Sequence, residues 1–143
     1  MFSLKDIGSL HFFLGIEVIP TKAGLFLSQH KYIRELLDNT GMSGAKDVST
    51  PLSTTQSLQL VDGTTAVDSF EFRRIVGSLQ YLSLTRPDIS FAVNKLSQFM
   101  HKPTANHWIA TKRLLRYLKH TIFYGIQIHK AGTPVLRTYS DAD

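Results

Sequence analysis

The sequence predicts an α+β fold: an N-terminal β-hairpin and helix, a long linker, a three-helix bundle and two C-terminal strands. Three observations support this fold. Apolar residues recur at helical spacing through three consecutive stretches between residues 69 and 120. Two short apolar runs flank a turn near the N-terminus, and apolar and polar residues alternate after residue 125. With 43% hydrophobic and 19% charged residues, the composition is typical of a folded chain.

The N-terminal elements are predicted from turn residues and hydrophobic runs. Residues 2–8 have the pattern of a helix end. Apolar runs at residues 10–18 and 25–27 flank a turn at residues 20–24, which is the pattern of a β-hairpin. We therefore expect an antiparallel pair of strands in this part of the chain.

A helix and a long connection follow the hairpin. Ser28 can accept a free backbone N–H of the first helical turn, and Gly41 suits the position just after a helix end. Residues 43–68 are rich in Ser, Thr, Gly and Asp and include Pro51. We expect them to form a long, mobile linker with weak local structure, joining two subdomains. The apolar positions expected on the helix are Tyr32, Ile33, Leu36 and Leu37.

Three helices are predicted next, over residues 69–84, from Pro87 onward, and from a capping Thr104 to about residue 120. The first helix ends before Pro87 because a proline disfavours helical geometry in the preceding residue. Gly77 costs up to about 1 kcal/mol relative to alanine in a helix interior, so we expect a neighbouring helix to approach closely there. The predicted buried positions are Phe72, Ile75, Val76, Leu79, Leu82, Ile89, Ala92, Val93, Leu96, Met100, Trp108, Leu115 and Leu118.

The C-terminal part of the sequence has the period of β-strands. Ile126 and Ile128 alternate with polar residues, and residues 130–134 have the composition of a turn. A second strand is predicted at residues 135–139.

Charge and composition restrict the function. The net charge of +5 favours an anionic partner such as nucleic acid, although many small basic proteins bind none. The absence of cysteine excludes disulfides, thiolate zinc sites and cysteine nucleophiles. Residues 1–10 lack the apolar core of a signal peptide, and the apolar run at 10–19 is too short to cross a membrane. We therefore expect an intracellular protein without a membrane partner.

A cationic row lies on the third predicted helix. Lys112, Arg116 and Lys119 share a helix face, and Arg113 flanks them. Such a row can contact phosphates in a sequence-independent, salt-sensitive way. The alternative is an ordinary solvated helix face.

The acidic and histidine residues do not form a complete active site in the sequence. Asp141 and Asp143 would share one face of a strand, but a two-metal centre needs further carboxylates. The six histidines have no metal-ligand spacing. His107 beside Trp108 is expected to be a packing or hydrogen-bonding residue.

Several segments together resemble the Pol polyprotein of copia-type LTR retrotransposons. They occur in the order of that family and cover nearly the whole chain, which makes the resemblance more specific than any one of them alone. The segments are FSLKDIGSLHFFLGIEV, GLFLSQHKYIRELLDNTGM, Thr50-Pro51-Leu52, FRRIVGSLQYLSLTRPDISFAVNKLSQFM, HWIATKRLLRYLK and YSDAD.

The resemblance implies the C-terminal part of a reverse transcriptase running into the start of RNase H. Residues 1–42 would be the end of the palm, with a primer-grip-like hairpin and the following helix. Residues 43–68 would be a linker, residues 69–121 a thumb- and connection-like helical bundle, and residues 122–143 the truncated start of an RNase H-like domain. The family places its polymerase aspartates in a Tyr-x-Asp-Asp turn upstream, and this sequence has no such turn. The chain is therefore expected to be catalytically inactive alone.

The resemblance also implies roles for individual residues. Phe13, Leu14 and Gly15 would match the element that grips the primer end, and Asp141 would be the first catalytic and metal-binding carboxylate of RNase H. The parent enzyme would use Mg²⁺, with no cofactor expected for this fragment alone. Its partners would be an RNA/DNA template–primer duplex and the remainder of the Pol polyprotein. The predicted phosphate contacts are Lys112, Arg113, Arg116 and Lys119.

Two other functions remain open from the sequence. The chain could be a non-catalytic nucleic-acid-binding module, or a genomic remnant of the element with no function. The parent element would act in a cytoplasmic particle or in the nucleus.

Overall fold

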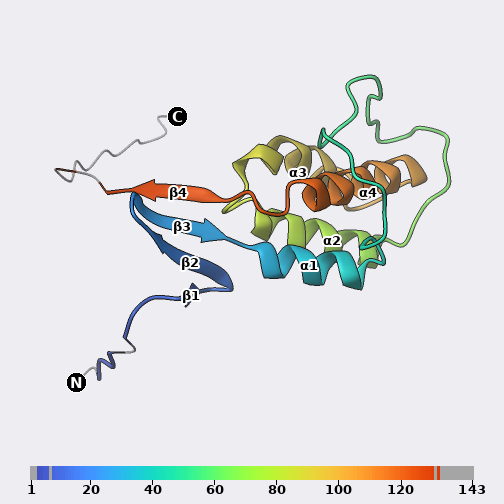
Figure 1. Cartoon of the computed structure of the whole chain (residues 1–143). Coiled ribbons are helices and arrows are strands. Elements are labelled where there is room, and N and C mark those ends of the chain that lie inside the picture. Colours follow the sequence, from blue (N-terminus) through green and yellow to red (C-terminus); the bar gives the residue numbers. More distant parts are fainter. Residues whose placement is uncertain (1–2, 7, 131, 133–143) are drawn as a thin grey trace, which may run out of the picture.

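One open four-stranded sheet and four α-helices make up the computed structural model, which describes residues 3–6, 8–130 and 132. The predicted α+β fold is therefore confirmed. Figure 1 shows the sheet extending from one end of a group of packed helices. The α-helices are α1 (His30–Asn39), α2 (Ser69–Leu82), α3 (Ser90–Ser97) and α4 (Ala105–His120), with a 3-10 turn, η1 (Pro87–Ile89), before α3.

All neighbouring strands of the sheet are antiparallel, in the order β1-β2-β3-β4. The predicted hairpin is confirmed as β2 and β3, which are joined through Lys22 and Ala23. The apolar run before it is not one strand, because Leu14 and Gly15 have φ angles of 52° and 78° and turn the chain between β1 and β2. The strands are β1 (Phe12–Phe13), β2 (Ile16–Thr21), β3 (Gly24–Ser28) and β4 (Ile126–His129).

Strand β4 completes the N-terminal sheet by pairing with β3, with Leu25 opposite Ile128. A β-carbon on Gly24 would overlap the Ile128 carbonyl oxygen, so the glycine permits this close pairing. The first predicted C-terminal strand is confirmed, but it is part of the hairpin's sheet. The second, at residues 135–139, lies outside the described residues, and the domain boundary at residue 122 stays a prediction.

One face of the sheet is apolar throughout. Side chains that pair across strands and those two residues apart on a strand share a face. Several of these side chains are exposed, including Phe13 at 59% and Ile128 at 46%. The face consists of Phe13, Ile16, Val18, Pro20, Leu25, Leu27, Ile126 and Ile128.

Helix α1 begins and ends as its sequence predicts. The Ser28 hydroxyl accepts the His30 backbone N–H at 3.2 Å. Gly41 has a φ of 66°, and the next N–H, of Met42, returns to the Leu37 carbonyl at 2.8 Å. These bonds satisfy carbonyls at the helix end that would otherwise have no partner.

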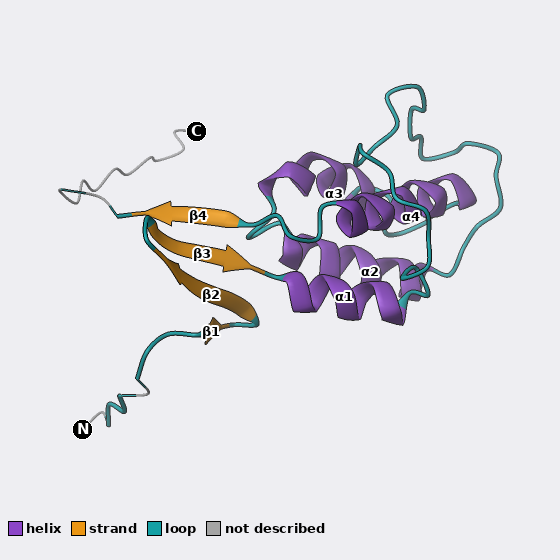
Figure 2. Ribbon diagram, in the orientation of Figure 1, coloured by secondary structure: helices purple, strands orange, loops and turns teal. Residues whose placement is uncertain are grey.

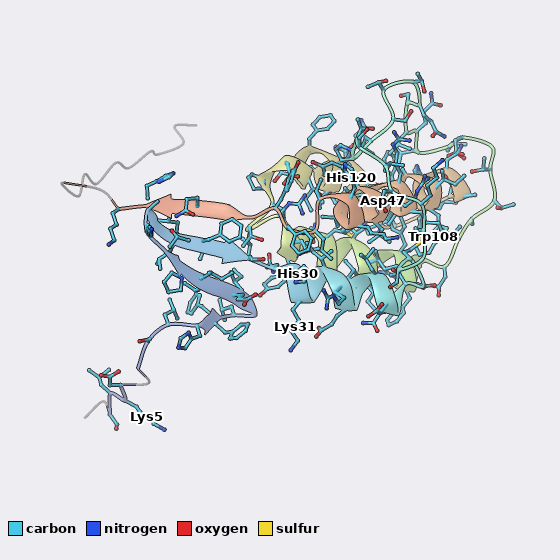
Figure 3. All side chains as sticks on the ribbon, in the orientation of Figure 1. Lys5, His30, Lys31, Asp47, Trp108 and His120 are labelled. Carbon is cyan, nitrogen blue, oxygen red and sulfur yellow. The ribbon has the colours of Figure 1, made fainter. Side chains whose placement is uncertain are left out.

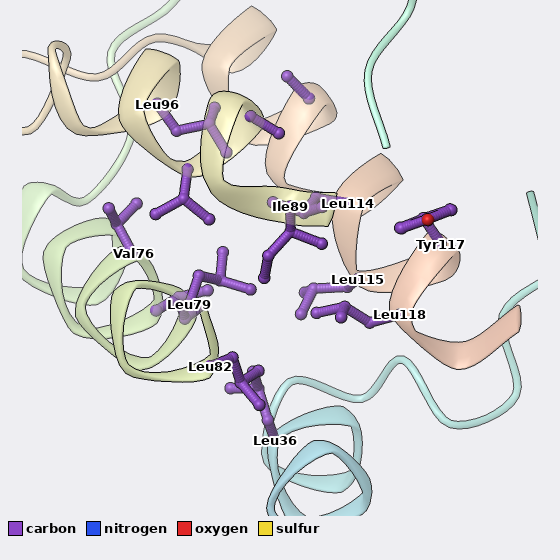
Figure 4. Close-up of a cluster of buried hydrophobic side chains, with 14 of the residues drawn as sticks. Leu36, Val76, Leu79, Leu82, Ile89, Leu96, Leu114, Leu115, Tyr117 and Leu118 are labelled. Atoms are coloured by element: carbon purple, nitrogen blue, oxygen red, sulfur yellow. The ribbon is translucent and has the colours of Figure 1, made fainter. Parts of the chain in front are cut away.

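The hydrophobic core is built from four helices rather than three. The sequence predicts helix α1 as a separate unit before the linker, but its buried side chains pack with those of α2, α3 and α4 (Figure 4). The reason is the strongly one-sided apolar stripe of α1, which must be covered. The predicted stripe of α2 is confirmed, and each of its five residues is fully buried. The α1 residues in this core are Ile33, Leu36 and Leu37.

Gly77 has no neighbour in the fold that explains it. A β-carbon built there would have no other heavy atom within 4 Å, and the residue is exposed. The expected close approach of a neighbouring helix is therefore wrong for the described chain. The buried side of α2 contacts the other helices, whereas Gly77 faces outward.

Replacing Gly77 with alanine should stabilise the protein by about 0.5–1 kcal/mol, because alanine restricts the unfolded chain and meets no obstacle. Thermal unfolding followed by circular dichroism should show a melting temperature about 2–5 °C higher. Gly41→Ala is the control of opposite sign, since its φ of 66° disfavours a β-carbon. A lower melting temperature for Gly77→Ala would contradict the free space beside this glycine.

Candidate nucleic-acid interface

Residues 43–68, here called the strap, are hydrogen-bonded to α4 and its start at several points instead of forming a free linker. Figure 2 shows them as a long loop between α1 and α2. The strap contains no helix or strand beyond a single bridge between Ala66 and Thr104, so the predicted weak local structure is confirmed. It is nevertheless held in place, because its backbone carbonyls accept hydrogen bonds from cationic side chains of α4.

Two of the predicted phosphate-binding residues hold the strap. Lys119 Nζ donates to the Ala45 carbonyl at 2.7 Å, and Arg116 Nε donates to the Lys46 carbonyl at 2.5 Å. Their stems are half-buried against the strap. These donors therefore satisfy backbone groups within the chain.

The other two predicted phosphate contacts have different surroundings. Arg113 Nη2 donates to Thr50 Oγ1 at 2.7 Å, so it too contacts the strap. Lys112 is exposed, with its Nζ 5.8 Å from the centre of the Trp108 ring. The structure thus separates Lys112 from the three strap-bound cations, and the phosphate-binding role of all four stays a prediction.

An acidic residue of the strap adds to this contact. Asp47 lies 3.5 Å from Lys119 Nζ and 3.7 Å from His120 Nδ1, and Figure 3 shows Asp47 next to His120. The partners are partly exposed, so each ion pair contributes little by itself.

His107 connects the strap to the start of α4. The Thr104 N–H donates to its Nδ1 at 2.9 Å, and its Nε2 donates to the Gln59 carbonyl of the strap at 2.8 Å. The ring is fully buried and stacks on Phe99 with centroids 4.0 Å apart. The prediction that His107 is a packing and hydrogen-bonding residue is confirmed.

A second contact between strap and α4 is centred on Asp62. Its carboxylate accepts the Thr104 hydroxyl at 2.7 Å and the Thr64 backbone N–H at 2.9 Å. These hydrogen bonds, that of Thr104 foremost, hold the pKa of Asp62 well below its usual range. Asp62 therefore keeps the charged form that ties the strap to the helix start.

A buried arginine, paired with a partly exposed aspartate, joins the end of α2 to the end of α4. Arg86 is 1% exposed and makes two hydrogen bonds to Asp88, at 3.0 and 2.7 Å. Its Nη1 donates to the Thr121 carbonyl at 3.0 Å, and Tyr117 and Tyr124 have ring centres 5.9 and 5.4 Å from the guanidinium carbon. No pattern in the sequence, apart from the turn around Pro87, indicates this pair.

Burial and hydrogen bonding shift the ionisation of this cluster. Burial alone raises the pKa of Asp88, but the hydrogen bonds from Arg86 and Tyr117 and the Arg86 charge outweigh it and lower the pKa overall. Burial, together with the bond its hydroxyl donates to Asp88 at 2.8 Å, raises the pKa of Tyr117. The cluster is therefore a fixed charged pair with a neutral tyrosine, and it serves the fold.

The predicted primer-gripping residues are the last residue of β1, Phe13, and the turn to β2, Leu14 and Gly15. Phe13 and Leu14 are 59% and 70% exposed. At Gly15 a β-carbon would lie 3.1 Å from the Tyr81 hydroxyl, so the turn adjoins the C-terminal half of α2. Phe13, Leu14 and Gly15, here called the hairpin tip, are thus presented beside a helix.

The outward side of α2 carries a row of exposed residues spaced three or four apart: Phe70, Arg73, Gly77 and Gln80, here called the α2 stripe. Arg74 is exposed beside it. Sequence reasoning missed both arginines. The sequence does contain a signal for them. Arg73 and Arg74 lie about one helical turn before Gly77, a glycine that no packing contact explains.

In residues 3–6, 8–130 and 132, no three His, Asp or Glu side chains are grouped so that they could hold a metal ion. The predicted RNase H carboxylate Asp141 lies outside these ranges. Among the described helices, none has the length and apolar character needed to cross a membrane.

Comparison with known proteins gives long, high-identity matches. The chain is 55% and 54% identical, over 142 residues, to the retrovirus-related Pol polyproteins from transposons RE1 and RE2 of Arabidopsis thaliana. These matches cover 99% of the chain but only 10% of either polyprotein. An uncharacterized mitochondrial protein of A. thaliana is 48% identical over 145 residues, which are 59% of its length. No family model matches, and no solved structure matches significantly.

Proposed function

Because the chain is homologous to one segment of the retrovirus-related Pol polyproteins of copia-type transposons, we propose that it positions the primer and holds the template–primer duplex in a reverse transcriptase. The chain spans about a tenth of the RE1 and RE2 polyproteins, so polymerisation belongs to the whole protein. Primer extension with Mg²⁺ by the chain alone is expected to give no product.

The observation that carries this proposal is the hairpin tip beside the α2 stripe. The tip offers exposed apolar side chains, and the stripe offers Gln80, a glycine without a neighbour, and Arg73, whose exposed guanidinium bonds Ser69 one turn earlier in the same helix. A glycine on an exposed helix face lets another molecule approach the helix backbone closely. Arginine and glutamine side chains are donors suited to phosphate and sugar oxygens. The hairpin tip and the α2 stripe together form a surface suited to contact the sugar–phosphate backbone of a duplex.

The α4 cations fit this role less well than the α2 stripe. Arg113, Arg116 and Lys119 donate to the strap, and a phosphate would have to replace those bonds. Lys112 is the exposed exception on α4, whereas on α2 Arg74 is exposed and holds no part of the strap. We therefore propose that the duplex lies on the side of the hairpin tip and α2.

Metal chemistry enters the proposal only through the whole polyprotein. There, Mg²⁺ would be the ion of both active sites, and Asp141 would be one RNase H ligand. Both assignments rest on the family resemblance.

Replacing Arg73 and Arg74 with glutamine should weaken binding of an RNA–DNA hybrid about tenfold and reduce the slope of log K against log salt by about 1–2, because two phosphate contacts are lost. Fluorescence anisotropy with a labelled hybrid at several salt concentrations measures both quantities. The matched variant is Arg113→Gln with Arg116→Gln, which removes the same charge from the strap contact. If the slope of log K against log salt falls in the Arg113/Arg116 variant but not in the Arg73/Arg74 variant, the duplex lies on α4 and the α2 assignment is wrong.

A further inference from the structure

A pocket of about 330 Å³ lies between the strap and helices α3 and α4. This volume is at the lower end of the range for small-molecule sites. Three separate parts of the chain form its walls, so the strap must be in place for the pocket to exist. It is lined by Leu52, Ser53, Thr54, Gln56, Ser57, Leu58, Phe91, Lys95, Ile109, Ala110 and Arg113.

The body of the pocket is apolar. Phe91 of α3 and Ile109 of α4 are 77% and 57% exposed, and both line it. Leu52 and Leu58 of the strap also contribute and pack partly against the core. Two large apolar side chains this exposed beside an open pocket favour a ligand with an apolar body.

The charges in the pocket wall have one sign. Lys95 and Arg113 line it, and no acidic residue is among the lining residues of the described chain. Arg113 is fixed by its Nη2 bond to Thr50, while its Nε is buried and has no hydrogen-bond partner among the described residues. Among the described residues neither Lys95 nor Arg113 forms an ion pair with an acidic side chain, so an anionic group in the pocket would gain two cationic partners.

We propose that this pocket binds an apolar carboxylate, a small molecule with a hydrocarbon or aryl body and one carboxyl group. The body lies against Phe91 and Ile109, and the carboxylate meets the Lys95 ammonium and the Arg113 guanidinium where it lines the pocket. A guanidinium suits a carboxylate because its planar donors match the two oxygens. This site is separate from the hairpin tip and the α2 stripe and does not depend on the proposed function.

The test uses octanoate with the full chain and follows methyl NMR shifts. Octanoate should bind saturably, with shifts at Leu52, Ile109 and Ala110, and about tenfold more tightly than neutral octanamide. Lys95→Gln should remove most of that preference without touching the strap contacts. Arg113→Gln should also remove the preference, but it breaks the strap bond to Thr50, so Lys95→Gln is the cleaner test. Arg34→Gln, which changes an exposed arginine on α1, should have no effect.

Three results would overturn the proposal. Equal binding of octanoate and octanamide would show that charge plays no part. Shifts at Leu25 and Ile128 of the exposed sheet face, and not at the pocket, would show general hydrophobic adsorption. Shifts of the pocket methyls by a single-stranded oligothymidylate, with none from octanoate, would assign the pocket to nucleic acid instead.

Discussion

Replacing Arg86 with methionine should lower the free energy of unfolding by about 2–3 kcal/mol, because the partly exposed Asp88 carboxylate loses two charge-assisted hydrogen bonds. The Thr121 carbonyl also loses its donor. Methionine fills much of the same volume, so the loss reports the polar contacts more than a cavity. Urea unfolding followed by circular dichroism measures it.

Two variants separate the ion pair from general effects. Arg34→Met removes an exposed arginine from α1 and should change stability by less than about 0.5 kcal/mol. Arg86→Met combined with Asp88→Leu removes both charges and should recover part of the lost stability, since no unpaired carboxylate remains. A loss below about 1 kcal/mol for Arg86→Met alone would show that the pair is not important to the fold.

The pair should also have a signature in pH. Because the folded-state pKa of Asp88 is lowered from 3.8, its contribution is present above the unfolded-state value and is lost as pH falls through the folded-state value. As the pH is lowered into the acid range, the free energy of unfolding should therefore fall less steeply in Arg86→Met than in the unchanged protein.

Replacing His107 with alanine should lower the free energy of unfolding by about 3–4 kcal/mol. The buried Thr104 N–H would lose its acceptor, the Gln59 carbonyl would lose its donor, and the stacking on Phe99 would leave a cavity. The strap should also release from the start of α4. Hydrogen exchange measures both effects, with faster exchange expected at Val67 and Ala105, whose N–H groups bond across this junction.

His107→Gln is the informative control for this prediction. Glutamine at this helix position can still accept the Thr104 N–H, as in a common capping arrangement. Because glutamine keeps this hydrogen bond but cannot stack on Phe99, we expect it to recover only about 1 kcal/mol of the stability lost in His107→Ala. If alanine and glutamine behave alike, the hydrogen bond at Thr104 contributes nothing measurable.

The helices were predictable because their signals are local. The spacing of Phe72, Ile75 and Val76 alone defines the buried side of α2, and each of these residues is fully buried. The Ser28 hydrogen bond just before α1 and the cap at Thr104 follow from side-chain chemistry within one helical turn. Periodicity and capping need no knowledge of distant residues.

The candidate sites were less predictable because their partners are far apart in sequence. Arg116 bonds to Lys46 across 70 residues, and nothing in a charged helix face shows which loop will cover it. Arg86 similarly reaches Thr121 across 35 residues. A row of cations was visible in the sequence, but its division between strap contacts and exposed Lys112 was not.

The pairing of β3 with β4 has a consequence for folding during synthesis. The two strands lie about 100 residues apart in the sequence, so the N-terminal hairpin leaves the ribosome long before its last neighbour is made. At about 5–20 residues per second, that interval is roughly 5–20 s. During this time one edge of β3 has no strand partner and the apolar sheet face is unshielded. We therefore expect chaperones to bind the hairpin while the rest of the chain is synthesised.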